Sequence, residues 1–342
     1  MVPLLFLLTR SCRRSRRRGR PVYEPADRLG RRPTRAGALR DPAPRALRPA
    51  RRAGYDVHWP SRAVSGHRDG SQTASEEEWT VTDFRAAPEH RFERVANFRD
   101  LAGHTTHDGR RVRPGRLLRS AHLGRASDTD LAVLARFGLR RVFDFRTASD
   151  IELEGPDRLP EGAENVLLPM PDPSQGRDIR KLMEGSGPEQ LEEIFGDGKG
   201  EEMMRGSAAG LVRERREPYA LFLKGLAEVG GVPALFHCSA GKDRAGWAGS
   251  VALLTIGVPE DQVIEQYLLS NRAAQQILDQ ATANGHGFFH EVLKPLVGVQ
   301  EDYIQASFAA VREDWGDFDG YLSKGLGITD AEREAIKKNL LE

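Results

Sequence analysis

The stretch from His237 to Gly246 reads HCSAGKDRAG, and it decides both the expected fold and the expected chemistry. It follows an apolar run that is typical of a buried strand, and it leads into a helix-like run that starts at Arg244. Small residues after Cys238 let the backbone curl so that successive N–H groups point inward, and such a nest at the start of a helix binds anions. The sequence therefore predicts an anion-binding loop with a cysteine at its centre.

Five residues separate Cys238 from Arg244. The N–H groups and the helix dipole that hold a phosphate also favour the thiolate, and a guanidinium can bind two phosphate oxygens at once. Cysteine-dependent phosphatase chemistry follows from this arrangement. We expect the phosphate to be held by Ser239, Ala240, Gly241, Lys242, Asp243 and Arg244.

The spacing alone is a weak signal, because Cys12 also has an arginine, Arg18, six positions further on. That pair lies in a run of arginines with no strand before it and no helix after it, and a motif needs its structural context. The alternative for Cys238, an inert buried cysteine, does not explain the charged residues that crowd the turn after it.

The cysteine count and the length place the chain in a broad class. It has 342 residues, two cysteines and an apolar content of 39%, which fits one or two domains in a reducing compartment. No apolar run approaches the ~20 residues that span a bilayer, and in residues 1–8 the apolar run precedes the positive charge, the reverse of a secretory signal. We expect a cytoplasmic protein without a transmembrane segment, and secretion without a standard signal stays open.

The net charge of +1 conceals two chemically different parts. Residues 1–75 contain 18 arginines, no lysine and 5 acidic residues, whereas the remainder contains 33 basic and 45 acidic residues. We expect residues 1–78 to form a disordered Arg/Pro-rich tail and residues 79–342 to form the catalytic domain. A nucleic-acid or membrane arm is one interpretation of the tail. A solvated tail or translation upstream of the true start is favoured, so no specific nucleic-acid partner is expected.

The globular part alternates short β-type runs with helical patterns. Strands are predicted at residues 92–98, 116–120, 139–145, 166–170 and 232–236, and helices at 127–137, 217–229, 244–256 and from 259 toward 283, with further short helices to the end. This order predicts an α/β fold with a central, mainly parallel sheet, flanking helices and a helical C-terminal part. Residues 172–217 are charged, glycine-rich and long for a connection, which predicts a helical lid or insertion, or else a surface loop.

Four motifs in this order resemble the bacterial tyrosine-phosphatase-like family of atypical dual-specificity phosphatases. They are NFRDLAG (97–103), DGRRVRPGRLLRS (108–120), VFDFRT (142–147) and HCSAGKDRAG (237–246). With YLLSN (267–271) and FDGYLSKGLGIT (318–329), the resemblance covers about residues 91–342. It implies a cysteine-phosphatase-like fold and a metal-free enzyme that needs no cofactor. The implied substrates are proteins phosphorylated on tyrosine, in some members on serine or threonine, or phosphoinositides.

The resemblance also implies roles for the residues of the loop. Cys238 would be the nucleophile that forms a phosphocysteine, Arg244 the phosphate clamp, and the backbone between them the oxyanion cradle. Lys242 and Asp243 match the family's Lys-Asp pair, which suits heavily phosphorylated ligands as well as phosphotyrosine. The supporting residues would be His237, Arg99 and Asp100.

A general acid must protonate the leaving oxygen and then activate water. Asp144 matches the aspartate of the family's strand-end motif and is the first choice for this acid, with Asp172 and Asp243 as rivals. The alternative for Asp144 is a structural ion pair with Arg146.

One position departs from the family's pattern. Ala245 stands where relatives usually carry a hydroxyl residue, which donates to the thiolate and helps it leave during hydrolysis of the phosphocysteine. This departure leaves a second hypothesis open, a phosphate-binding pseudophosphatase that recognises phosphoproteins or phosphoinositides without efficient turnover. An enzyme of sulfur transfer or arsenate reduction fits the loop but not the other three motifs.

Overall fold

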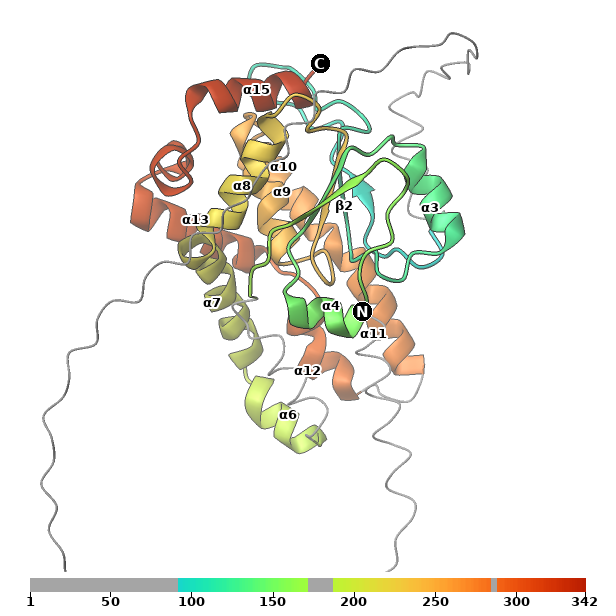
Figure 1. Cartoon of the computed structure of the whole chain (residues 1–342). Helices are drawn as coiled ribbons and strands as arrows, with labels where there is room; N and C mark the ends of the chain where they lie inside the picture. The colour runs from blue at the N-terminus through green and yellow to red at the C-terminus, as the bar shows by residue number, and fades with distance from the viewer. Residues whose placement is uncertain (1–91, 172–186, 284–287) are drawn as a thin grey trace, which may run out of the picture. The chain divides into compact units, whose positions relative to one another are not determined.

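The structure is a computed structural model, and it describes residues 92–171, 187–283 and 288–342 (Figure 1). The predicted tail lies outside these residues. All of the described residues belong to one compact unit. None of the helices in these ranges is long and apolar enough to cross a membrane.

A five-stranded sheet with the order β1-β2-β5-β3-β4 lies at the centre of this unit. Its strands are β1 (Arg99–Asp100), β2 (Leu117–Ser120), β3 (Arg141–Asp144), β4 (Glu164–Leu167) and β5 (Ala234–His237). Only β1 runs antiparallel to its neighbour, whereas β2, β5, β3 and β4 are mutually parallel. The strand that delivers Cys238 is therefore the middle strand, and the carboxyl ends of β2 and β3 flank it.

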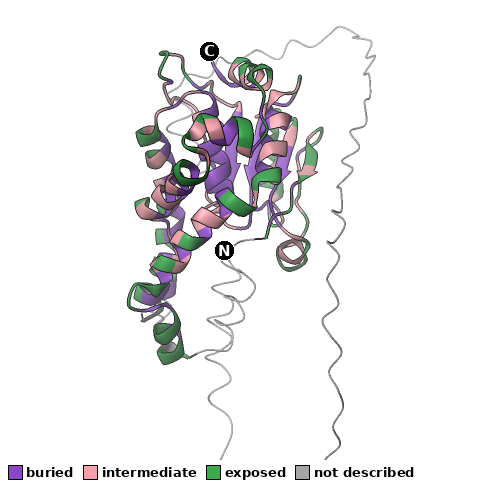
Figure 2. Cartoon of the chain, turned by 90° about the vertical axis from the view of Figure 1, so that its left-hand side faces the viewer, coloured by how far each residue is buried: buried purple, intermediate pink, exposed green. Residues whose placement is uncertain are grey.

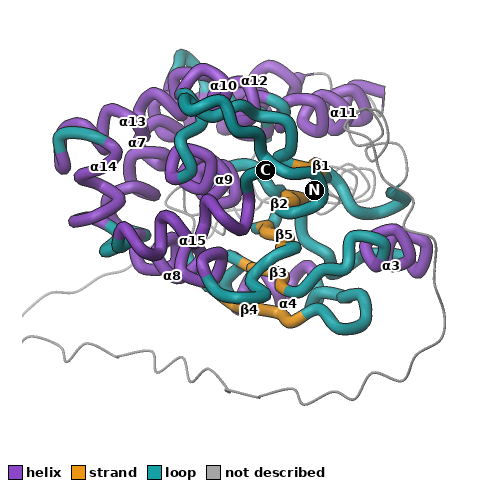
Figure 3. Tube along the Cα trace, turned by 90° about the horizontal axis from the view of Figure 1, so that it is seen from above, coloured by secondary structure: helices purple, strands orange, loops and turns teal. Residues whose placement is uncertain are grey.

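Helices cover both faces of the sheet. In chain order they are α3 (Asp128–Ala135), α4 (Ala148–Glu154), α6 (Pro188–Phe195), α7 (Lys199–Glu214), α8 (Arg216–Ala227), α9 (Arg244–Thr255), α10 (Glu260–Leu268), α11 (Ser270–Ala283), α12 (Phe288–Val297), α13 (Glu301–Trp315), α14 (Phe318–Gly320) and α15 (Asp330–Leu340), with a π-turn at Tyr321–Gly325. Seen from above, the strands form a row with α8, α9 and α15 on one side and α3 on the other (Figure 3). The predicted α/β fold with a mainly parallel sheet and a helical C-terminal part is confirmed.

The two faces of the sheet bury two separate cores, because successive strand residues point to opposite faces. Phe143 and Phe236 face the larger core, together with Phe222 of α8 and Trp247 of α9. The smaller core lies under α3 and contains Leu118, Val142, Leu235, Leu134 and Phe98. In Figure 2 the strands at the centre are coloured mostly as buried, whereas the helices around them carry most of the exposed colour. With both faces covered, β5 and the loop that follows it are held from two sides.

The prediction of a strand at residues 92–98 is wrong. The backbone N–H groups of Glu93, Arg94 and Val95 donate to the carboxylate of Asp130 in α3, at 2.7–3.2 Å, so this stretch is held by a helix terminus and not by a neighbouring strand. The helix expected from residue 259 toward 283 is also divided, since α10 ends at Leu268 and α11 begins at Ser270.

The predicted lid segment is described only from residue 187 onward. Its helix α6 buries Leu191 and Phe195 against Val292 and Leu293 of α12. Its helix α7 packs side by side with α13 and contributes Leu211 to the larger core (Figure 1). Both helices are thus packed parts of the unit in this structure, and a lid movement of the segment stays a prediction.

Candidate active site

The loop after β5 lies at the carboxyl edge of the parallel strands. Cys238 follows the last residue of β5 and is buried, with 3% of its surface exposed. Helix α9 begins at Arg244, as the sequence predicts. The register pairs His237 with Ser120 of β2 and with Asp144 of β3, so three strand ends meet beside the cysteine.

The carbonyl groups of this loop are held from outside by five hydrogen-bond donors. The Cys238 carbonyl lies 3.0 Å from His237 Nδ1, and the Ser239 carbonyl accepts from the backbone N–H of His122 at 3.1 Å. Asn97 Nδ2 donates to the carbonyls of Ala240 and Gly241, both at 3.0 Å. Arg119 donates from Nε to the Gly241 carbonyl and from Nη2 to the Lys242 carbonyl, both at 2.9 Å. In a trans peptide the carbonyl and the following N–H point in opposite directions. Carbonyls that point outward therefore turn the N–H groups of residues 239–243 toward the centre of the loop. Inward-facing N–H groups of this kind can bind an anion, and the phosphate-binding role of the loop stays a prediction.

Glycine is required in the loop at one position. Gly241 has a φ of +69°, in the left-handed region, and a Cβ there would overlap the carbonyl oxygen of Ser120. The loop consequently lies directly against the end of β2.

Arg244 is 4% exposed and is held by residues from three segments. Its Nη1 donates to Asp150 Oδ2 at 2.8 Å and to the carbonyls of Phe145 and Met170, and its Nη2 donates to Ser239 Oγ at 3.1 Å. Burial works against the charge of Asp150, but the charge and hydrogen bond of Arg244 outweigh it, so the pKa of this carboxyl lies below its usual range. The guanidinium is thereby fixed with its Nη2 side on the loop.

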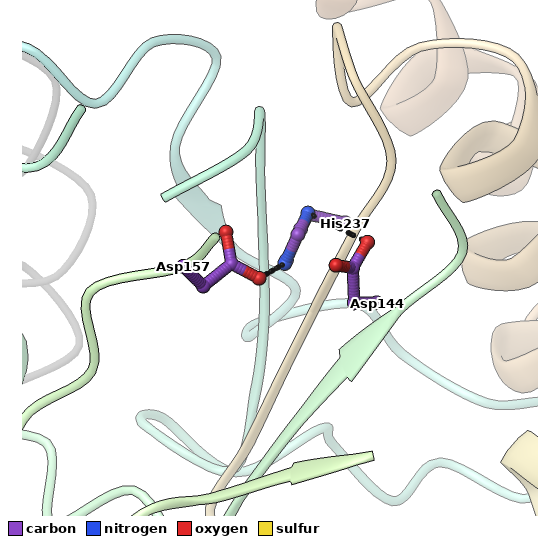
Figure 4. Close-up of side chains that lie close together, drawn as sticks. All are labelled: Asp144, Asp157 and His237. Carbon is purple, nitrogen blue, oxygen red and sulfur yellow. Dashed lines mark hydrogen bonds and ion pairs between the residues drawn. The ribbon is translucent and has the colours of Figure 1, made fainter. Parts of the chain in front are cut away.

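A buried ion cluster holds the other side of the loop. His237 Nε2 lies 2.9 Å from Asp157 Oδ2, and its Nδ1 lies 3.7 Å from Asp144 Oδ1 (Figure 4). Arg146 binds both carboxylates at 2.8–2.9 Å. Each nitrogen of His237 faces an oxygen acceptor, because Nδ1 also contacts the Cys238 carbonyl at 3.0 Å. This arrangement favours the doubly protonated imidazolium, which can donate from both nitrogens.

Charge accounts for the protonation states in this cluster. Burial alone would lower the pKa of His237, but the negative charges of Asp144 and Asp157 raise it above its usual range. Burial also works against the charge of Asp157, yet its hydrogen bond to His237 and the charge of Arg146 lower its pKa to about 2. The three side chains of Figure 4 have the residue types of a metal site, but Arg146 already supplies the cation between the two carboxylates.

The position of Asp144 argues against its predicted role as general acid. Its side chain has no exposed surface, and both of its oxygens accept hydrogen bonds from Arg146, at 2.8–3.1 Å. A carboxylate enclosed in this way cannot reach a leaving-group oxygen. The geometry is that of the alternative, a structural ion pair with Arg146.

The two rivals for the acid lie differently. Asp172 is outside the described residues. Asp243 immediately precedes α9, with 16% of its side chain exposed, and pairs with Lys242 at 2.8 Å. The structure describes two candidate acids, Asp144 and Asp243. The side chain of Asp243 is partly exposed, whereas that of Asp144 is not.

The two predicted supporting residues on β1 hold the surrounding backbone. Arg99 donates to Asn97 Oδ1 at 2.6 Å and to Ser270 Oγ at 2.9 Å, so it orients the asparagine that binds the loop. Asp100 accepts from the backbone N–H groups of Ala102 and Gly115, and burial raises its pKa to about 7. Asp100 thus supports the turn around β1 and β2.

Four residues that position the loop were not predicted: Asn97, Arg119, Asp150 and Asp157. Asn97 and Arg119 lie within the quoted motifs NFRDLAG and DGRRVRPGRLLRS, but those motifs give no role to either residue. Asp150 stands three residues after Thr147 in a capping box of α4. That signal indicates a helix start but not its contact with Arg244.

Comparisons with known proteins agree with this geometry. Residues 90–342 match the sequence model of the tyrosine phosphatase family, and the chain belongs to this family. A Cupriavidus necator protein, provisionally named a tyrosine-protein phosphatase, is 34% identical over 250 residues, which is 70% of this chain and 85% of the relative. The triple specificity protein phosphatase PtpB of Mycobacterium tuberculosis is 29% identical over 270 residues, 72% of this chain and 96% of the relative.

A third relative, the tyrosine-protein phosphatase of Nostoc commune, is 28% identical over 234 residues, 65% of this chain and 73% of the relative. The predicted family and the predicted class of enzyme, a protein-tyrosine phosphatase, are confirmed. The pseudophosphatase hypothesis is not favoured by these comparisons.

Proposed function

We propose that this chain hydrolyses phosphate monoesters through a phosphocysteine on Cys238. The observation that supports this proposal is the set of outward-held carbonyls, which turns the N–H groups of residues 239–243 toward the space next to the cysteine. Such donors stabilise the charge that develops on the phosphoryl oxygens in the transition state.

In the first step the Cys238 thiolate attacks phosphorus and the bond to the leaving oxygen breaks. Nη1 of Arg244 is committed to Asp150 and two carbonyls, so the phosphoryl group is held through the Nε and Nη2 side of the guanidinium. The same interactions position sulfur and phosphorus for an in-line reaction.

We assign the general acid to Asp243. The carboxylate pairs with Lys242 when no phosphate is bound. A bound phosphate dianion attracts the lysine and repels the carboxylate, and both effects favour the protonated form of Asp243. The acid then delivers its proton to the leaving oxygen.

In the second step the ionised Asp243 accepts a proton from water, which attacks the phosphocysteine and releases inorganic phosphate and the thiolate. The thiolate leaves here without a hydroxyl donor at position 245, because Ala245 has none. We expect this step to limit turnover.

Phosphotyrosine is the substrate class that the family membership supports first. Lys242 lies within the loop with 12% of its side chain exposed, so its charge is available to a second phosphate. The name of the PtpB relative, a triple specificity phosphatase, is a further reason to test phosphoserine, phosphothreonine and phosphoinositides.

The nucleophile is tested with Cys238→Ser and p-nitrophenyl phosphate. Phosphate release should fall at least ~10³-fold, because the covalent intermediate is lost, while inorganic phosphate should still raise the unfolding temperature of the variant. Acid quenching with ³²P-labelled substrate should label the wild type and not the variant. Full activity of Cys238→Ser would rule out the phosphocysteine.

The acid is tested by comparing leaving groups. Asp243→Asn should lower kcat/KM, which reports the first step, by ~10²-fold for phenyl phosphate, whose leaving oxygen needs a proton, and much less for p-nitrophenyl phosphate, whose phenolate leaves unaided. Asp144→Asn is the matched control, and it should reduce thermal stability without changing the ratio between the two substrates. The opposite result would return the acid role to Asp144.

A further inference from the structure

A second arginine, Arg119, contacts the carbonyl groups of the loop. It is on β2, in register with Phe236 of β5, and its side chain is fully buried. Its Nε donates to the Gly241 carbonyl at 2.9 Å and its Nη2 to the Lys242 carbonyl at 2.9 Å. One planar guanidinium thus fixes two consecutive peptide groups of the phosphate loop.

The remaining contacts of Arg119 are also to uncharged groups. Nη1 donates to Gln266 Oε1 at 3.1 Å, and Nη2 lies 3.3 Å from Ser270 Oγ. None of the hydrogen bonds that the structure shows for this guanidinium goes to a carboxylate. The charge of Asp243 acts on it without such a bond, after the larger effects of Cys238 and Tyr267. Arg141 of β3, on the other side of β5, differs because Glu228 pairs with it at 2.7 Å.

The helix after the loop leaves room for this arginine. A Cβ at Gly246, in the first turn of α9, would lie 3.2 Å from Arg119 Nη2 and 2.9 Å from the ring of Tyr267. A side chain at this position would press on the guanidinium. The glycine therefore lets the first turn of α9, the loop and Arg119 pack against one another.

A buried charge is costly unless an opposite charge balances it. Under the proposed function, the loop beside Arg119 holds the negatively charged phosphoryl group next to Cys238. Burial lowers the pKa of Arg119 to about 10, and the Cys238 charge is the largest of the effects that oppose this fall. The guanidinium thus remains protonated at neutral pH.

We propose that Arg119 is a positioning residue of the phosphatase reaction. The anion in the loop balances its buried positive charge. Its two hydrogen bonds to the loop direct the backbone N–H groups of Lys242 and Asp243 toward the phosphate. This inference rests on the proposed function and extends it. Arg119 acts through the loop and touches neither the substrate nor the reacting atoms.

The charge is tested with Arg119→Gln in the full-length chain. The rate of alkylation of Cys238 by iodoacetamide is measured from pH 4 to 9, with Cys238→Ser as the blank for Cys12. Loss of a charge beside the loop should move the midpoint of this profile upward by about one pH unit or more. Binding of inorganic phosphate, measured by calorimetry, should weaken ~10-fold.

Arg119→Lys separates the charge from the geometry and serves if the glutamine variant does not fold. Lysine keeps the charge but lacks the planar pair of donors. The alkylation profile should stay within a few tenths of a pH unit of the wild type, whereas phosphate affinity and kcat should each fall ~10-fold. Arg141→Gln, on the opposite flank of β5, is the matched control and should change neither the profile nor phosphate binding.

The inference is overturned if a folded Arg119→Gln or Arg119→Lys variant has the alkylation profile, the phosphate affinity and the kcat of the wild type. Failure of the proposed function gives a different pattern, because the wild type itself would then neither bind inorganic phosphate nor release phosphate from p-nitrophenyl phosphate.

Discussion

Asp150 Oδ2 accepts a hydrogen bond from Arg244 Nη1 at 2.8 Å and another from the backbone N–H of Thr147 at 3.0 Å. One carboxylate oxygen therefore caps helix α4 and fixes the arginine of the phosphate loop. The start of a helix far from the loop in sequence sets the direction of the guanidinium. Formation of α4 and formation of a competent site are coupled through this atom.

Replacement of Asp150 should separate capping from activity. Asp150→Asn keeps an oxygen for the cap but removes the charge that holds Arg244, so kcat/KM should fall ~10-fold with a small change in unfolding temperature. Asp150→Ala should show the same fall in kcat/KM. It should in addition lower the free energy of unfolding by ~1 kcal/mol, because the hydrogen bond that caps α4 is lost. Steady-state kinetics and thermal unfolding check both expectations.

The control for this experiment is Glu332, which occupies the same position in the capping box of α15. Glu332→Ala should lower stability by a similar amount and leave kcat/KM unchanged. Equal kinetics for Asp150→Asn and the wild type would show that the contact with Arg244 has no role in activity.

Gly241→Ala should abolish phosphate binding. An L-residue at a φ of +69° costs ~1–2 kcal/mol, and the added Cβ would in addition overlap the Ser120 carbonyl, which forces the loop off the end of β2. Gly109→Ala is the matched control, because Gly109 has a φ of +86° with nothing within 4 Å of the added Cβ. It should show only the backbone cost in urea unfolding, with normal activity. Equal effects of the two variants would mean that the close approach is unimportant.

A hydroxyl at position 245 should speed the second chemical step. Ala245 is fully buried next to Arg244, so serine, which adds one atom, is a better probe than threonine, whose extra methyl risks ~1–3 kcal/mol of overpacking. A hydrogen bond to the leaving thiolate is worth ~1.5–3 kcal/mol, which corresponds to at least ~10-fold in the rate of phosphocysteine hydrolysis.

Stopped-flow kinetics with p-nitrophenyl phosphate measure this effect of Ala245→Ser. The steady rate should rise relative to the burst of the first turnover. Ala248→Ser, one turn further along α9 and equally buried, should leave the ratio of steady rate to burst unchanged. An unchanged ratio in Ala245→Ser would show that release of the thiolate does not limit turnover.

The sequence was sufficient for the fold class and for the loop because their signals are local. The strand, the turn with Gly241 and the start of α9 are contiguous in the chain, and the parallel sheet follows from alternating short strands and helices. The strand at residues 92–98 failed for a non-local reason, since its N–H groups are satisfied by Asp130, more than 30 positions away.

The residues that position the loop were missed for the same reason. Asn97, Arg119, Asp150 and Asp157 bind it across 80 to 144 positions of sequence, and no periodicity or spacing carries such a contact. The role of Asp144 stays a prediction. A strand-end aspartate beside a catalytic loop suggests chemistry, whereas the arginine two residues later determines its actual surroundings.

The ion pair between His237 and Asp157 should give stability a defined pH dependence. Asp157 has a pKa of about 2 in the folded protein and the ordinary value of 3.8 when unfolded, so its contribution is present above about pH 4 and lost as the pH falls toward 2. His237 has a raised pKa, so its contribution is complete below its unfolded value of 6.5 and is lost as the pH rises through the higher folded value.

The free energy of unfolding by urea, compared between the wild type and Asp157→Asn from pH 2 to 9, measures this dependence. The advantage of the wild type should be greatest between about pH 4 and 6 and decline on both sides. His237→Ala should cost ~3–5 kcal/mol near neutral pH, because it leaves Asp157 buried beside Arg146 without its second partner and releases the Cys238 carbonyl. A difference between the wild type and Asp157→Asn that stays constant across the whole range would mean that the imidazole and the carboxylate do not form a charged pair in the folded protein.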